Sequence, residues 1–216
     1  MAKTEAFDKH SDMYDEWFDR NQDAYNAELK AVRLAMPASP AVGLEVGVGS
    51  GKFAVPLGIG IGVEPSEEMA RKAEIKGIRV FRNVAEDLPF GPAEFDFVLM
   101  VTTICFVDSV LRSFQEAFRV LKPKGCIIVG FVDKESDLGR RYSANRVNSL
   151  FYKDASFFSA REVSSFMADA GFMNPTFHQT LIPGEPTDMV QSGFGKGAFV
   201  VIRGVKNHRL PGLENR

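Results

Sequence analysis

The stretch LEVGVGSGKF, residues 44–53, decides the fold. It begins inside a short apolar run that is typical of a buried strand, and glycines follow at positions 47, 49 and 51. Glycines let the backbone come close to a ligand, and a helix that starts directly after them points its free N–H groups at that ligand. Lys52 stands where the dinucleotide fingerprint GxGxxG needs its third glycine, so the motif here is GxGxG. Taken alone, the loop fits either a ligand cradle or a tight strand-to-helix turn.

Apolar runs and helical segments alternate on the C-terminal side of the glycine loop. Including the run that leads into the loop, strands are expected at residues 42–46, 59–63, 78–81, 95–101 and 126–132. Helices are expected at residues 52–57, between Ser66 and Gly77, and after Asp108, where Ser66 and Asp108 act as capping residues. Pro123-Lys124-Gly125 predicts a turn. Strands that are apolar on both faces and alternate with helices predict a parallel sheet covered on both sides.

Helical segments flank this core. Asn21 can cap a helix whose apolar positions 25, 29 and 32 share one face, and the prolines at 37 and 40 end it. Residues 135–152 are polar and predict a helical insertion. A capping box, Ser159 to Glu162, opens one more helix. Strands are then expected at residues 174–182 and 197–203, separated by a loop at 184–195, and they finish the sheet in antiparallel fashion.

These elements predict an α/β fold, with a Rossmann-like, seven-stranded mixed sheet whose last strand is antiparallel and whose faces are flanked by helices. The expected parts are an N-terminal helical lid (1–40), a Rossmann-like core that binds the cofactor (41–133), a helical cap insertion after the fifth strand (134–158), the C-terminal helix and last two strands of the core (159–205), and a tail (206–216).

Composition excludes several functional classes. The chain has 216 residues, of which 45% are hydrophobic and 25% charged, and its formal charge is −2. These values are typical of an ordered globular domain and argue against a dedicated nucleic-acid or membrane-surface binder. The only cysteines, Cys105 and Cys126, lie in apolar runs and form no metal-binding pair, so neither a disulfide nor a metal site is expected. The polar N-terminus has no secretory signal, and we expect a cytoplasmic protein, as a monomer or a homodimer.

Two further features follow strands next to the glycine loop, where open α/β sheets bind ligands. Glu64 ends the second strand, nineteen residues after Glu45, and a carboxylate there can accept hydrogen bonds from two ribose hydroxyls. The loop NVAEDLPF, residues 83–90, follows the third strand. Its Ala85 amide and Glu86 carboxylate can meet a ring nitrogen and an exocyclic amine of a base. Each feature alone also fits an ordinary solvated loop.

The order of these landmarks resembles the class I S-adenosylmethionine-dependent methyltransferases, in the small-molecule (UbiE-like, type 11) branch. The resemblance rests on ExGxGxG, an acid ending the second strand, AExLPF at 85–90, FDFVLM at 95–100 and RVLKPKGCIIVG at 119–130. It covers about residues 41–132, and AGF at 170–172 and the last strands continue it. YDEWF at 14–18 is similar to the lid segment of small-molecule members.

The resemblance implies S-adenosylmethionine as cofactor, with S-adenosylhomocysteine as product. It places the methionine part of the cofactor over Gly47 and Gly49. Glu45 would orient the loop or contact the cofactor's ammonium group, and Glu64 would bind the ribose. The implied cofactor set is Glu45, Gly47, Gly49, Gly51, Glu64, Pro65, Met69 (against the adenine ring), Ala85 and Glu86 (at its edge), and Thr102 (near the amino acid end). The family often has Asp at the position of Val84, so the adenine acceptor role passes to Glu86 or to backbone. Pro56 and Gly58 also shorten the helix after the glycine loop.

The acceptor side offers fewer motifs. The fourth strand ends in TTICF, residues 102–106, which lacks both the Asp/Asn-Pro-Pro-aromatic motif of amino-directed nucleic-acid methylases and the Pro-Cys of cytosine methylases. A small-molecule acceptor is therefore expected and no nucleic acid. Candidate pocket residues are Tyr14, Trp17, Phe18, Phe106, Arg140, Arg141, Tyr142 and Tyr152, and Phe7 is a further aromatic candidate. No general base is evident, and His10 and Tyr14 are the weak candidates.

Three other functions remain open at this point. A non-catalytic member could bind the cofactor as a sensor or scaffold. A nicotinamide-dependent oxidoreductase would use the same strand-loop-helix frame, although Lys52 interrupts its fingerprint and no Tyr-x-x-x-Lys set is present. Aminopropyl transfer would require acidic residues near the fourth strand, and TTICF supplies none.

Overall fold

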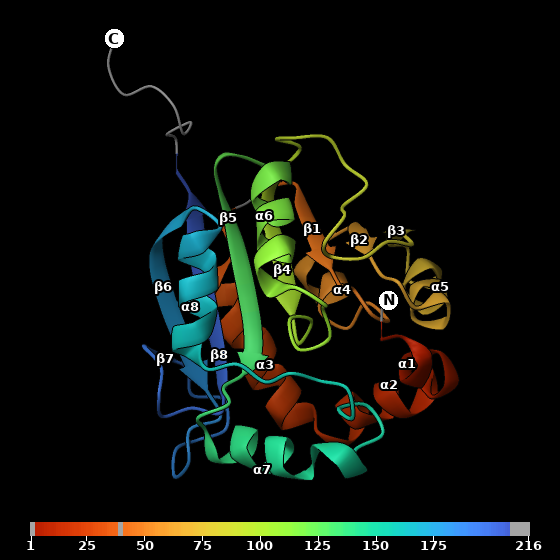
Figure 1. Ribbon diagram of the computed structural model, residues 1–216. Coiled ribbons are helices and arrows are strands. Elements are labelled where there is room, and N and C mark those ends of the chain that lie inside the picture. The colour runs from red at the N-terminus through yellow and green to blue at the C-terminus, as the bar shows by residue number, and fades with distance from the viewer. Residues whose placement is uncertain (1–2, 39–40, 208–216) are drawn as a thin grey trace.

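One mixed sheet runs through the computed structural model, which describes residues 3–38 and 41–207 (Figure 1). Its strand order is β3-β2-β1-β4-β5-β8-β6-β7. The strands are β1 (Gly43–Val46), β2 (Ile61–Val63), β3 (Arg79–Phe81), β4 (Phe95–Val101), β5 (Leu121–Val132), β6 (Phe172–Thr180), β7 (Gln191–Ser192) and β8 (Phe199–Lys206). The helices are α1 (Glu5–Lys9), α2 (Ser11–Arg20), α3 (Gln22–Ala35), α4 (Ala54–Leu57), α5 (Glu67–Ile75), α6 (Val110–Val120), α7 (Asp137–Asn145), the 3-10 turn η1 (Arg146–Asn148) and α8 (Ala160–Asp169).

The pairing pattern confirms the predicted Rossmann-like sheet. Strands β1 to β5 pair in parallel, and β8 pairs antiparallel with both β5 and β6. The crossover from β3 back to β4, on the far side of β1, creates the switch point where open α/β sheets bind ligands. The carboxyl ends of β1, β2 and β4 therefore lie side by side.

Alternating side chains along the central strands fill two separate cores. Val98 and Met100 of β4 belong to the core under α6 and α8, whereas Phe97 and Leu99 belong to the core under α2 to α5. The two-residue period of a strand sends successive side chains to opposite faces, and both faces are covered by helices. This burial explains why the strands read as continuous apolar runs.

Three local predictions need correction. An eighth strand, β7, lies inside the segment predicted as the loop 184–195, where it pairs with β6. The turn predicted at residues 123–125 is a bulge within β5, because Leu121 already pairs with Phe95 and the register then shifts at Lys124, which has φ +66°. Helix α6 is capped by Ser109, which accepts a hydrogen bond from the Arg112 amide, and not by Asp108.

Other boundary signals are confirmed. Ser66 caps α5 through the Met69 amide, and Ser159 and Glu162 form the predicted capping box. Asn21 occupies the N-cap position of α3, but its side chain makes no capping hydrogen bond and donates to the Trp17 carbonyl. Of the predicted tail 206–216, residues 208–216 lie outside the described residues, as does the proline at 40.

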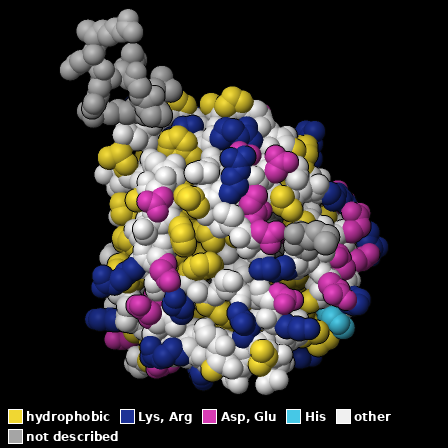
Figure 2. All heavy atoms as spheres, viewed as in Figure 1, with side chains coloured by type: hydrophobic (Ala, Val, Ile, Leu, Met, Phe, Trp, Pro, Cys, Tyr) yellow, Lys and Arg dark blue, Asp and Glu magenta, His cyan; other side chains and the backbone are white. Residues whose placement is uncertain are grey.

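Helices α1, α2 and α7 lie at the carboxyl edge of the parallel strands, whereas α3 packs against β5, β6 and β8 (Figure 1). Helices α1 to α3 fall in the predicted lid, and α7 and η1 fall in the predicted cap. No helix in the described chain is long and apolar enough to span a membrane. Within residues 3–38 and 41–207, no cluster of three metal-ligating side chains occurs, and both cysteines are free and buried. Figure 2 shows basic and acidic side chains interspersed over the face in view.

Candidate functional site

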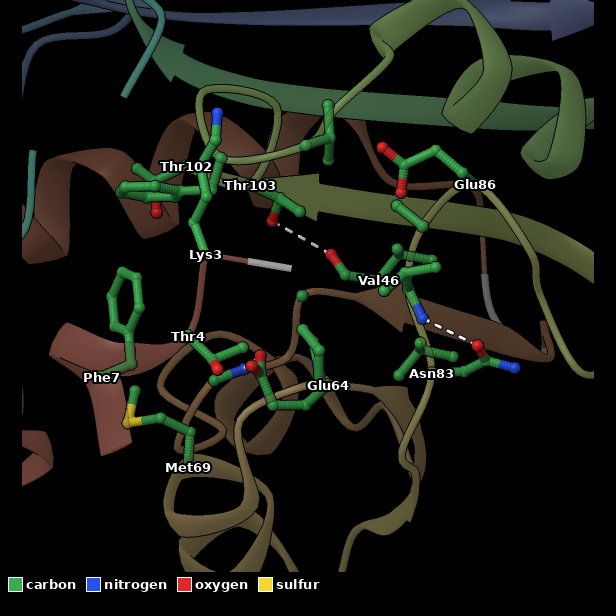
Figure 3. A pocket seen from close by; sticks show the side chains of 18 of the residues that line it. Lys3, Thr4, Phe7, Val46, Glu64, Met69, Asn83, Glu86, Thr102 and Thr103 are labelled. Atoms are coloured by element: carbon green, nitrogen blue, oxygen red, sulfur yellow. Dashed lines mark hydrogen bonds between the residues drawn. The ribbon is translucent and has the colours of Figure 1, made fainter. Parts of the chain in front are cut away.

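A cavity of about 380 Å³ opens at the carboxyl ends of β1, β2 and β4 (Figure 3). Its volume is within the range of small-molecule sites. Four segments line it: the glycine loop, the end of β2 with α5, the loop after β3, and the end of β4. Lys3, Thr4 and Phe7 close it from the side opposite Asn83 and Glu86 (Figure 3). It is therefore built at the switch point of the sheet.

Gly47 is fixed in place by its surroundings. Its φ is +72°, and a Cβ at this position would lie 2.5 Å from the side chain of Thr103. The amides of Gly47 and Val48 both donate to the Val63 carbonyl, at 2.8 and 3.0 Å. The loop is thereby held against the end of β2, with its backbone exposed to the cavity, and only glycine fits there.

The third glycine has a different role from the one expected. Gly51 does not line the cavity, whereas Gly47 and Gly49 do. A Cβ on Gly51 would lie 2.7 Å from Ile78, and its φ is +83°. Gly51 therefore allows the loop to pack closely against the segment that leads into β3.

Glu64 is buried at the end of β2 and lines the cavity. Its Oε2 accepts a hydrogen bond from the Gly49 amide at 2.9 Å, and its Oε1 accepts one from the Ser66 amide at 2.9 Å. Burial raises the pKa of Glu64 to about 7, although both amide bonds act in the opposite direction. Each carboxylate oxygen keeps a second lone pair, so the group can accept two more hydrogen bonds from a ligand.

Glu45 is buried behind the glycine loop and does not line the cavity. The Ala54 amide donates to this carboxylate, whereas Oε2 has no hydrogen-bond partner among the described residues. Burial raises the pKa of Glu45 well above its ordinary value, and the charge of Glu64 adds to this effect. The contact with Ala54 ties the start of α4 to β1, which supports the expected loop-orienting role.

The loop after β3 forms the far wall of the cavity. Asn83 accepts a hydrogen bond from the Val84 amide through Oδ1 (Figure 3). Glu86 lines the cavity, but its Oε1 already accepts from the Asp108 and Ser109 amides, at 2.7 and 2.9 Å. Glu86 thus clamps this loop to the start of α6, and only its Oε2 is left for the edge of a base. Ala85 and Met69 line the cavity as expected.

Two threonines form the end of β4. Thr103 donates through Oγ1 to the Val46 and Val101 carbonyls, at 3.0 and 3.1 Å. Thr102 has φ +52°, which is rare for a threonine and places backbone strain at the cavity wall. Strained residues of this kind are concentrated at functional sites.

The N-terminal lid is attached to the core by Asp8. Its Oδ1 accepts from the Ser66 hydroxyl at 2.6 Å and from the Glu68 amide at 3.4 Å. This contact holds α1 against the start of α5 and brings Lys3, Thr4 and Phe7 to the cavity. Lys72 adds an ion pair with Asp12 of α2, at 2.6 Å.

Tyr14 is a predicted lid residue that lines the cavity, as Phe7 does. Burial raises the pKa of its hydroxyl, although an interaction with Thr102 acts in the opposite direction. Tyr14 is therefore a hydrogen-bond donor at neutral pH and not a ready base. His10, the other candidate base, lies between α1 and α2 and does not line the cavity.

Aromatic rings continue from the cavity toward the cap. Phe106 lines the cavity and contacts Phe7, with ring centroids 5.0 Å apart. Tyr152 stacks on Phe106 at 6.0 Å, and Tyr142 of α7 stacks on Tyr152 at 5.1 Å. A second cavity of about 20 Å³ lies beside Tyr152 and shares Thr102 with the first. Phe106, Tyr142 and Tyr152 therefore form one ring stack, from the cavity to the cap.

Six of the eight predicted pocket residues do not line the cavity. Tyr142 and Tyr152 belong to the ring stack, and the other four, Trp17, Phe18, Arg140 and Arg141, lie elsewhere. Trp17 is 38% exposed and packs edge-on against Phe18, which is buried against Phe53 and Tyr25. Arg140 and Arg141 lie on the exposed face of α7, and Arg140 pairs with Asp137 at 2.5 Å. Phe18 lies where it does because it packs in the hydrophobic core, and the two arginine side chains are solvated. The structure does not support a pocket role for any of the four.

Known proteins resemble this chain over most of its length. A family model described as a methyltransferase domain matches residues 44–129. A crystal structure of a Thermotoga maritima protein, described as an S-adenosylmethionine-dependent methyltransferase and possible histamine N-methyltransferase, is 48% identical, with a TM-score of 0.88 over 94% of this chain and 98% of that one. The chain belongs to the S-adenosylmethionine-dependent methyltransferases. An uncharacterized protein of Methanocaldococcus jannaschii is 43% identical over 93% of this chain and 98% of that protein.

The methyltransferase family assignment confirms the predicted fold and cofactor. A ubiquinone/menaquinone biosynthesis C-methyltransferase of Rickettsia bellii is 36% identical over 39% of this chain and 42% of that protein, in line with the predicted branch. S-adenosylmethionine is the cofactor of this family, and the cavity fits it: Gly47 leaves no room for a side chain, and Glu64 is buried at its wall with acceptor capacity to spare.

Several residues of this methyltransferase site could not be found by motif. Lys3 and Thr4 line the cavity, yet the polar N-terminus looks like an ordinary tail. Val107 and Asp108 line it because α6 begins one residue later than predicted. Glu28 of α3 is buried among the apolar positions of its helix but does not line the cavity.

Proposed function

We propose that this methyltransferase transfers a methyl group from S-adenosylmethionine to a small-molecule acceptor. The observation that carries the proposal is Glu64: a buried carboxylate at the end of β2 that lines the cavity beside Gly47 and Gly49. A carboxylate in this position is the ribose ligand of open α/β sheets. The bonds from the Gly49 and Ser66 amides hold it in place before a ligand arrives.

The remaining cofactor contacts follow from the lining of the cavity. We assign the methionine part to the backbone of Gly47 and Gly49 and to the Thr102 segment. Adenine would lie between Met69 and the loop of Ala85 and Glu86, with Pro65 at the ribose end. Glu45 and Gly51 support the loop from behind, because neither lines the cavity.

The protein's own residues position the reaction and exclude water. When bound, the cofactor supplies a sulfonium methyl group, which an acceptor atom takes by in-line displacement. The Thr102 and Phe106 wall fixes the direction of approach, and Phe7 and Tyr14 cover the site from the lid. Alignment and water exclusion lower the barrier of such a displacement. Tyr14 can orient an acceptor by donating its hydroxyl proton in a hydrogen bond.

Glu64→Ala tests the assignment. Losing the ribose contacts should weaken S-adenosylhomocysteine binding by about 1–3 kcal/mol, measured by calorimetry, with the fold retained by circular dichroism. Glu185→Ala, at an exposed loop position, is the matched control and should bind as the native protein does. Unchanged affinity in Glu64→Ala would contradict the role of Glu64.

An acceptor screen tests catalysis itself. The description of the Thermotoga relative makes histamine the first compound to try, followed by other small amines, phenols and thiols. Transfer of label from S-[methyl-³H]adenosylmethionine to any of them would establish the enzyme. Cofactor binding without transfer to any compound would favour the non-catalytic alternative.

A further inference from the structure

Lys3 contributes a basic side chain to the wall of the cofactor cavity. Among the described residues that line the cavity it is the only lysine or arginine, and the other charged side chains there are the acids Glu64, Glu86 and Asp108. The Lys3 side chain lies on the Thr102 side of the cavity, opposite Glu86 (Figure 3). In the described lining, positive side-chain charge is therefore confined to this end of the cavity.

The ammonium group of Lys3 is available to a ligand. Within residues 3–38 and 41–207, no acidic side chain forms an ion pair with it. Burial raises the pKa of the Cys105 thiol to about 12, and the positive charge of Lys3 acts in the opposite direction. The same thiol donates to the Thr102 carbonyl at 3.1 Å. The charge of Lys3 thus acts on the turn that carries Thr102, in agreement with the position of its side chain in the cavity (Figure 3).

Helix α1 fixes where Lys3 lies. Thr4, the next residue, is the N-cap residue of this helix, and its carbonyl accepts a hydrogen bond from the Asp8 amide at 2.9 Å. The Asp8 carboxylate in turn accepts from the Ser66 hydroxyl at 2.6 Å, at the start of α5. Lys3 is therefore held at the cavity by the segment that also carries Glu64.

The cofactor and its product carry an anionic group at their amino acid end. Both molecules have a carboxylate and an ammonium group there, whereas their ribose hydroxyls are neutral. In the proposed function this end lies at Gly47, Gly49 and the Thr102 segment, on the side of the cavity where Lys3 lies. A carboxylate removed from water needs a charged partner, and a lysine ammonium group supplies a charge-assisted hydrogen bond of this kind.

We propose that the Lys3 ammonium group binds the carboxylate of the cofactor, and that this ion pair selects ligands that carry the carboxylate. The inference deepens the proposed function and rests on it, because it names a specificity-determining residue of the same site. Glu64 recognises the ribose from the core, and Lys3 recognises the amino acid end from the lid. The bound cofactor thereby joins the lid to the core.

Paired ligands test this proposal. The protein is titrated calorimetrically with S-adenosylhomocysteine and with its decarboxylated analogue, which keeps the amine and the thioether but lacks the carboxylate. The native protein should bind S-adenosylhomocysteine at least about tenfold more tightly than the analogue. Equal affinities would overturn the role of Lys3 and leave the proposed function standing. No binding of S-adenosylhomocysteine would defeat the proposed function, and this inference with it.

Three variants locate the preference. Lys3→Met keeps the length of the side chain and removes its charge, so S-adenosylhomocysteine should bind about tenfold more weakly while the analogue binds as before. Lys3→Arg keeps the charge and should keep the preference. Lys9→Met removes an exposed charge from α1 and should bind both ligands as the native protein does. A preference that survives in Lys3→Met, or an equal loss of affinity for both ligands, would overturn the proposal.

Discussion

The wall of the cavity that we assign to the cofactor combines glycine backbone with the side chains of Glu64 and Met69, whereas the wall that we assign to the acceptor consists of aromatic side chains. Gly47, Gly49 and the Thr102 segment present main chain to the cavity at the ends of β1 and β4. The other side is a stack of rings from the lid, from the segment after β4 and from the cap. The cofactor wall binds the feature that all family members share, whereas the acceptor wall can change with each acceptor.

The largest loss of stability and of cofactor affinity is expected at Gly47, where the glycine backbone is packed most closely. Gly47→Ala places a methyl group against Thr103 in a left-handed conformation and should cost about 2–4 kcal/mol of unfolding free energy, together with most of the cofactor affinity. Gly58→Ala is the matched control: its φ is +70°, but nothing lies within 4 Å, so only about 1 kcal/mol should be lost. Urea unfolding measures both. Equal losses would show that Thr103 does not enforce the glycine.

An intermediate effect, on the pH dependence of stability, is expected from the buried carboxylates Glu28 and Glu64. Burial raises the pKa of Glu28 to about 8 and that of Glu64 to about 7, above the ordinary value of 4.5. The folded protein therefore keeps protons that the unfolded chain releases, and stability should fall as pH rises from about 5 to 8, by at least about 2 kcal/mol. Carboxylates with lowered pKa values, such as Glu116, change the stability only at pH values below this window.

Urea unfolding at several pH values checks this slope. Glu28→Gln should flatten the curve between pH 7 and 8, and Asp23→Asn, at an exposed position of the same helix, should leave it unchanged. Stability that stays level or rises between pH 5 and 8 would contradict the raised pKa values of these buried carboxylates.

The smallest effect is expected at the lid. Asp8→Ala removes the contacts with Ser66 and Glu68 and should cost about 0.5–1.5 kcal/mol of stability. Cofactor affinity should fall severalfold, because Lys3, Thr4 and Phe7 are no longer held at the cavity. Glu5→Ala, which removes an exposed ion pair with Lys9 from the same helix, should change neither quantity. Calorimetry with S-adenosylhomocysteine compares the two variants, and identical affinities would show that α1 does not contribute to the site.

The same contrast explains what the sequence could predict. Buried strands precede the glycine loop, Glu64 and the loop at residues 83–90. Because the carboxyl ends of parallel strands meet at one edge of the sheet, the positions of these residues in the sequence predict that they lie together in space. The sheet was predictable for the same reason. Its bulge at Lys124 and the short strand β7 were not, because both depend on pairing with neighbours and not on local pattern.

The acceptor side lacks such a rule. Phe106 and Tyr152 meet only because the cap folds back over β4, and nothing in the spacing distinguishes them from Trp17 or Phe18, which pack elsewhere. Arg140 and Arg141 were predicted pocket residues, yet both are exposed on α7. Glu28 is buried on the apolar face of α3, which the apolar periodicity of that helix does not indicate for a carboxylate.

Calorimetric titration with S-adenosylhomocysteine, with NAD as the parallel control, tests the central claim most directly. We predict micromolar binding of S-adenosylhomocysteine, because Glu64 and the GxGxG loop form its site. We predict no binding of NAD, because Lys52 replaces the third glycine of the dinucleotide fingerprint. Binding of NAD alone, or of neither compound, would contradict the assignment of the cavity.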